Sequence, residues 1–126
     1  MEYTKIYQSG AAILTVTAGD QPIGNEAQFM DVLSACGELE CDRILFEQGS
    51  FAPAFFQLST RLAGEILLKL SIYQLPAALV CAEDELPAGK FADFALETNR
   101  GDSFRIFTDR AKAVAWLAAL SINYYY

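Results

Sequence analysis

Residues 43–81 read RILFEQGSFAPAFFQLSTRLAGEILLKLSIYQLPAALVC, with a short apolar run at each end. The first run, Arg43–Phe46, and the last, residues 77–81, each have the length and composition of a strand buried on both faces. Between them, apolar residues recur at helical spacing from near Pro53 to about Tyr73: Phe55, Leu58, Leu62, Ile66 and Leu70. A strand, a helix and a second strand predict a parallel pair joined by a right-handed crossover.

The alternation of strands and helices extends to both sides of this unit. Residues 3–8 and 11–17 have strand patterns joined by the turn signal Ser9-Gly10, which predicts an opening hairpin. A further strand is expected at residues 104–107. It lies between two helices that carry these apolar residues: Phe91, Phe94 and Ala95 in the first, and Val114, Leu117 and Ile122 in the second. The predicted order is β-β-α-β-α-β-α-β-α, one α/β domain over residues 1–126 with a mostly parallel sheet and an antiparallel N-terminal strand.

Local signals predict where the helices begin and end. Asn25 has the features of a helix N-cap, and Gln28 three residues later completes a capping-box pattern. Gly37 is expected to stop that helix. Gly64 lies inside the second helix, where glycine costs about 1 kcal/mol relative to alanine. We therefore expect another backbone to approach Gly64 closely.

Composition excludes several classes of protein. The chain has 126 residues, and its 16 acidic and 9 basic side chains give a net charge of −7, which opposes binding to nucleic acids and to anionic membranes. No stretch approaches the roughly 20 apolar residues of a membrane span, and the N-terminus lacks the pattern of a secretory signal. The odd number of cysteines (Cys36, Cys41 and Cys81) matches no disulfide or zinc framework, so we expect a cytoplasmic protein.

The chain contains no histidine, which removes the commonest general base, the histidine triads and nearly all catalytic zinc sites. We therefore expect no catalytic residue, no bound metal and no cofactor. An enzyme that uses carboxylates and magnesium remains as a hypothesis, because Asp20, Glu47 and Asp84 follow predicted strands. That hypothesis requires these three carboxylates to cluster.

Six polar residues are candidates for a binding surface. Ser59, Thr60 and Arg61 interrupt the apolar phase of the second helix, and a hydroxyl pair beside an arginine would form a phosphorylation or anion-binding site or the solvated face of that helix. At the end of the third helix, Asn99 would contribute to a binding site or form a left-handed helix cap, and Arg100 would reach an anion or a partner. Glu65 is the sixth candidate.

Two aromatic groups also suggest binding. Phe51, Phe55, Phe56 and Phe91 would line an apolar pocket for a small molecule, or belong to the core. The terminal Tyr124-Tyr125-Tyr126 would dock on a partner subunit or fray, and a homodimer would use such a contact.

Two segments carry a family resemblance. Residues 56–70, with Leu-Ala-Gly-Glu at 62–65, and residues 94–101, ending in Glu-Thr-Asn-Arg-Gly, resemble a bacterial domain family of unknown function with a STAS-like fold. STAS-like domains are best known as anti-sigma-factor antagonists with a regulatory serine or threonine near the second helix. The antagonists carry Asp-Ser-Ser-Gly there, whereas this chain has Leu58-Ser59-Thr60-Arg61.

The sequence and the resemblance together favour a non-enzymatic regulatory or protein-interaction module that acts through the surface around Ser59 and Arg61. The alternative is a small-molecule-binding α/β domain with an aromatic-lined pocket. The expected partner is another protein or a second copy of the chain.

Overall fold

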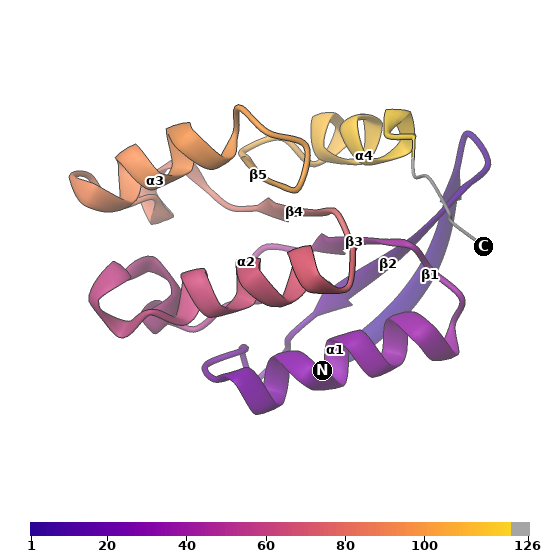
Figure 1. The fold of residues 1–126 in the computed structure, drawn as a ribbon, viewed down its shortest axis with the longest axis horizontal. Helices are drawn as coiled ribbons and strands as arrows, with labels where there is room; N and C mark the ends of the chain where they lie inside the picture. Colours follow the sequence, from indigo (N-terminus) through magenta and orange to yellow (C-terminus); the bar gives the residue numbers. More distant parts are fainter. Residues whose placement is uncertain (122–126) are drawn as a thin grey trace.

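Five strands form one sheet in residues 1–121, the part of the chain that this computed structural model describes (Figure 1). The sheet order is β1-β2-β3-β4-β5; β1 is antiparallel to β2 and the other neighbours are parallel. The α/β class, the antiparallel N-terminal strand and the parallel remainder are therefore confirmed. The strands are β1 (Glu2–Gln8), β2 (Ala11–Thr17), β3 (Arg43–Phe46), β4 (Ala77–Val80) and β5 (Phe104–Phe107).

The helices cover the two faces of the sheet unequally. Successive right-handed crossovers between neighbouring parallel strands place their helices on the same face. Accordingly, α1, α2 and α3 pack against one face and α4 against the other (Figure 1). The helices are α1 (Glu26–Glu38), α2 (Leu62–Ile72), α3 (Lys90–Thr98) and α4 (Arg110–Ala119), with short 3-10 helices η1 (Pro53–Phe56), η2 (Leu58–Thr60) and η3 (Glu83–Glu85).

Alternate residues of each strand enter different core layers, as the two-residue period of a strand requires. In β3, Ile44 and Phe46 face the layer under α1, α2 and α3, and Leu45 faces the layer under α4. Arg43 is also buried, and its guanidinium Nη1 donates to the carbonyl oxygens of Leu117 and Leu120 at 2.6 and 3.1 Å. A buried strand arginine thus satisfies carbonyl groups at the end of α4.

The second helix is shorter than the sequence predicts. Instead of one helix from Pro53 to Tyr73, the chain forms η1, η2 and then α2, separated by extended Gln57 and left-handed Arg61. The hydroxyl of Thr60 shares its one proton between the carbonyl oxygens of Ala54 and Gln57, which competes with continuous helical bonding. The apolar spacing that predicts a longer helix reflects the burial of Phe55 in η1 and of Leu62, Ile66 and Leu70 in α2, while Leu58 in η2 is only partly buried.

Two glycine predictions are wrong. Gly37 lies within α1, and Glu40 adopts the positive φ of 56° that follows the helix. A Cβ added to Gly64 would have no atom of another element in residues 1–121 within 4 Å, so no other backbone in that part of the chain approaches it closely.

The predicted start of α1 and the predicted hairpin turn are confirmed. The side chain of Asn25 accepts a hydrogen bond from the Gln28 amide, although the Gln28 side chain returns to the Gly24 amide instead of that of Asn25. Ser9 and Gly10 both have positive φ, as a two-residue turn between antiparallel strands favours. The predictions for Ile122 and the terminal tyrosines lie outside the described residues.

Candidate interaction surface

A groove lies where the chain leaves the carboxyl ends of β3 and β4. In open α/β sheets this edge is the usual place for ligands. The groove has a volume of about 450 Å³, and we call it the carboxyl-edge groove. Its lining residues are Phe51, Pro53, Phe56, Gln57, Glu85 and Pro87.

Aromatic rings support the groove from the core side. Phe51 and Phe55 stack with ring centroids 4.2 Å apart, and Phe56 lies 5.3 Å from Phe91. Phe55 is 0% and Phe91 3% exposed, so both belong to the core, whereas Phe51 and Phe56 also line the groove. Of the four phenylalanines predicted to line a pocket, two line the groove and two lie in the core beneath it.

The turn at Ser59 and Thr60 is tied to one wall of the groove. Thr60 Oγ1 lies 2.6 Å from the carbonyl oxygen of Ala54 and 2.8 Å from that of Gln57, and it accepts from the Leu62 amide at 3.3 Å. These contacts hold η2 against η1, which supplies Pro53 and Phe56 to the lining. Thr60 thus positions the groove wall, while the Ser59 side chain is exposed.

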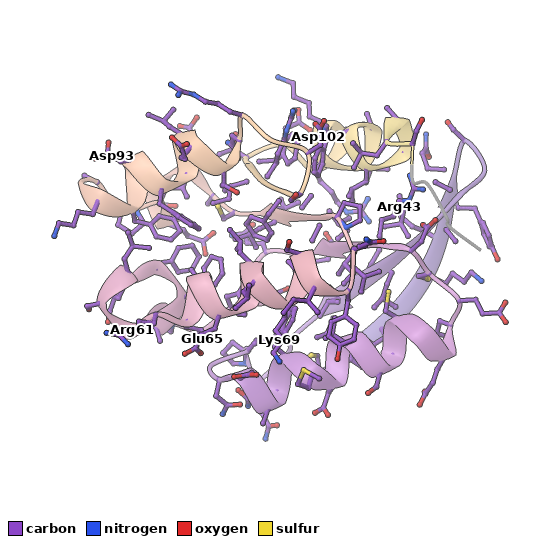
Figure 2. All side chains as sticks on the ribbon, viewed as in Figure 1. Arg43, Arg61, Glu65, Lys69, Asp93 and Asp102 are labelled. Carbon is purple, nitrogen blue, oxygen red and sulfur yellow. The ribbon has the colours of Figure 1, made fainter. Side chains whose placement is uncertain are left out.

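Arg61 ends that turn and lies between η2 and α2. It is exposed and has a φ of 65°, a conformation that favours glycine. Within residues 1–121 its side chain has no hydrogen bond or ion pair, and Figure 2 shows it at the end of the molecule that the η1 and η2 turns form. It directly precedes α2, where the helix dipole is positive, and exposed Glu65 lies in the first turn of that helix.

The structure does not bring Asn99 and Arg100 into this surface. Asn99 has helical backbone angles, not the predicted left-handed ones, and its side chain binds the backbone of Ile106. Arg100 is exposed at the C-terminal end of α3. Figure 2 places the nearby Asp102 far from Arg61 in its view. Asn99 therefore has a structural contact that accounts for it.

Metal binding by Asp20, Glu47 and Asp84 finds no support. The described part of the chain holds no group of three acidic, cysteine or histidine side chains spaced to bind a metal ion. The two carboxylate oxygens of Glu47 instead share the single Nε–H of Arg110, at N–O distances of 2.9 and 3.0 Å. The cluster that the magnesium hypothesis requires is absent from residues 1–121.

The cysteines are free and buried. Burial raises the pKa of the Cys36 thiol to about 12 and that of Cys81 to about 11, and it also raises the pKa of Cys41. A thiol with a raised pKa carries little thiolate near neutral pH, so none of the three is set up as a nucleophile.

Sequence reasoning missed four of the groove residues. Pro53, Gln57, Glu85 and Pro87 come from two segments 28 or more positions apart, which only the sheet topology brings together. The sequence signal that could have indicated the groove is the pair Pro53 and Pro87, each of which follows one of the neighbouring parallel strands β3 and β4.

A family model described as "Domain of unknown function (DUF4180)" matches residues 8–117. The chain belongs to the DUF4180 family. The match contains β2 to β5 and every residue of the carboxyl-edge groove, so the surface described above lies within the DUF4180 domain. Comparisons with curated proteins and with solved structures gave no match.

Among residues 1–121 of this DUF4180 chain, no helix is both long enough and apolar enough to cross a bilayer.

Proposed function

We propose that this DUF4180 domain is a non-enzymatic, STAS-like interaction module that binds another protein through Arg61 and the adjoining carboxyl-edge groove. The observation that carries the proposal is the state of Arg61. It combines a left-handed backbone, an exposed cationic side chain and a place at the positive end of α2.

Two of these features, the left-handed backbone and the cation at the helix N-terminus, are unfavourable in the isolated domain. A left-handed conformation costs a non-glycine residue roughly 1–2 kcal/mol, and a cation at a helix N-terminus loses the favourable dipole interaction that an anion gains. No ion pair with a described residue offsets these costs. Strained residues of this kind cluster at functional sites, and an acidic group of a partner would pair with Arg61.

The position of Arg61 in the sequence supports the STAS-like part of the proposal. In the antagonists that this chain resembles, glycine occupies the place of Arg61, and the backbone there has the φ that glycine favours. Bacterial origin belongs to the same proposal and rests on the resemblance. A cytoplasmic location fits the three free, buried cysteines. A second copy of the chain is one form that the partner would take.

The groove favours a polypeptide over a small molecule. Three of its lining residues, Pro53, Gln57 and Glu85, are exposed. Small-molecule pockets bury roughly 70–90% of their ligand, whereas a chain segment that docks on a surface keeps one side in water. Small-molecule binding is the second outcome that the experiment below distinguishes.

The test is affinity capture with tagged full-length protein from native cells, compared between wild type, Arg61→Glu and Lys112→Glu. Lys112 is exposed on α4, which packs on the other face of the sheet, so its reversal is a matched charge control. We expect at least one protein, or a second copy of this chain, to bind wild type and the Lys112 variant but not the Arg61 variant. Equal capture by all three overturns the proposal. Native mass spectrometry of the purified protein is the second measurement. A non-peptide adduct in that spectrum would favour small-molecule binding over the proposed protein interaction.

A further inference from the structure

We propose that the carboxyl-edge groove accepts a cationic, proline-containing segment of a partner polypeptide. This inference rests on the proposed function and specifies the chemistry of the partner. It is carried by the apolar lining of the groove, the acidic residues on one side of it and the fixed position of one carboxylate.

The apolar lining is of the kind that binds proline-rich segments. Phe51 and Phe56 come from the η1 side, and Pro53 and Pro87 lie on the two segments that enclose the groove. Grooves lined by aromatic rings bind polyproline II segments, whose conformation is already extended and loses little entropy on docking. The volume of about 450 Å³ is enough for a few side chains of such a segment.

The charge on the η3 side of this lining is negative. Glu85 lines the groove, and Glu83 and Asp84 precede it in η3; all three are exposed. Among residues 1–121, no lysine or arginine belongs to the lining. The net charge of −7 adds a long-range field that attracts a cationic segment. Charge complementarity therefore selects lysine or arginine next to the apolar anchor.

Glu85 is held in place before a ligand arrives. Its Oε1 accepts a hydrogen bond of 2.7 Å from the Ala82 amide, which closes the turn of η3. The other carboxylate oxygen has no hydrogen bond or ion pair with residues 1–121. One oxygen thus fixes the side chain and the other is free to accept from a cationic side chain. This arrangement lowers the entropy lost when a partner binds.

The experiment selects phage-displayed random dodecapeptides on the full-length protein and measures binding of the enriched peptides by fluorescence polarisation. We expect enriched sequences to contain proline together with lysine or arginine. Glu85→Gln keeps an oxygen for the Ala82 amide and removes the charge, so we expect binding to weaken by about twofold to fivefold. Its matched control is Glu97→Gln, at an exposed glutamate on α3 outside the groove lining.

A second variant addresses the apolar lining. Pro53 is exposed, so Pro53→Ser leaves the core intact, and we expect it to weaken the same peptides. The inference is overturned by enrichment of acidic sequences, by no enrichment, or by equal affinities for wild type and the Glu85 and Pro53 variants. If Arg61→Glu still loses its protein partner in those cases, the interaction module stands and only the groove chemistry fails. If Arg61→Glu keeps its partner while selected cationic peptides bind the groove, the proposed role of Arg61 fails instead.

Discussion

The side chain of Asn99 makes two hydrogen bonds with the backbone of Ile106, in the way that a neighbouring strand would. Its Nδ2 donates to the Ile106 carbonyl oxygen at 3.1 Å, and its Oδ1 accepts from the Ile106 amide at 2.7 Å. Thr98 adds a bond from its hydroxyl to the Phe104 carbonyl oxygen at 2.9 Å. Because β5 is at the edge of the sheet, these side chains satisfy backbone groups that would otherwise be open to pairing with another chain.

Replacing Asn99 with aspartate should therefore destabilise the fold. Asp has nearly the same shape, but its carboxylate cannot donate to the Ile106 carbonyl and would place negative charge beside it. We expect the free energy of unfolding to fall by about 1–2 kcal/mol, measured by urea denaturation. The control is Arg100→Gln at the adjacent exposed residue, for which the change should stay within about 0.5 kcal/mol. A similar loss in both variants would contradict the role of the Asn99 side chain.

Much of the fold could be predicted because its signals are local. The apolar runs of β3 and β4 are buried throughout, and the sequence of each run shows this directly. The hairpin turn at Ser9-Gly10 and the Asn25 cap depend on residues only a few positions apart. Such signals do not need knowledge of the tertiary structure.

The candidate surface was harder to predict because its contacts cross the sequence. The break before α2 depends on the hydroxyl of exposed Thr60, which lies within hydrogen-bond distance of the carbonyl oxygens of Ala54 and Gln57. The role of Asn99 depends on a strand seven positions later, and the groove joins residues that follow two different strands. Periodicity identifies which residues are apolar and does not show which polar side chain bonds to which backbone.

Gly64→Ala should stabilise the protein. Gly64 lies inside α2 with ordinary helical φ, and a Cβ there would meet no atom of another described element within 4 Å. We expect the free energy of unfolding to rise by about 0.5–1 kcal/mol. Gly49→Ala is the matched control, since its Cβ also has open space but its φ is +83°, so we expect it to lower stability by roughly 1 kcal/mol. A loss of stability in the Gly64 variant would mean that another chain packs against this face of α2.

Substitutions of Arg61 should separate stability from binding. Glycine relieves the left-handed strain, so we expect Arg61→Gly to match or exceed wild-type stability, by up to about 1 kcal/mol in urea denaturation. The same variant removes the guanidinium and should lose the protein partner in affinity capture. Arg61→Val is expected to be less stable than wild type, because a β-branched residue is strongly disfavoured at this φ. If Arg61→Gly retains the partner, the guanidinium is not what the partner contacts.

The buried cysteines should resist alkylation in the native protein. Burial raises the pKa of Cys36 to about 12 and of Cys81 to about 11, so little thiolate forms at pH 8. We expect iodoacetamide at pH 8 to leave both residues unmodified over hours in the native protein and to modify all three cysteines in urea, as read by peptide mass spectrometry. Rapid native modification of Cys36 would show that the region around it opens often.

The same raised pKa values predict loss of stability in alkali. The ordinary thiol pKa is 9.0, so above that pH the unfolded chain releases protons that the folded chain retains at Cys36 and Cys81. Since the folded state then binds more protons, the free energy of unfolding is unaffected by these groups below pH 9 and falls as the pH rises from 9 toward 11. Urea denaturation of wild type and Cys81→Ala at pH 7.5 and 10.5 measures this contribution. The decline should be smaller in the variant, and an equal decline would show that Cys81 does not retain its proton in the folded protein.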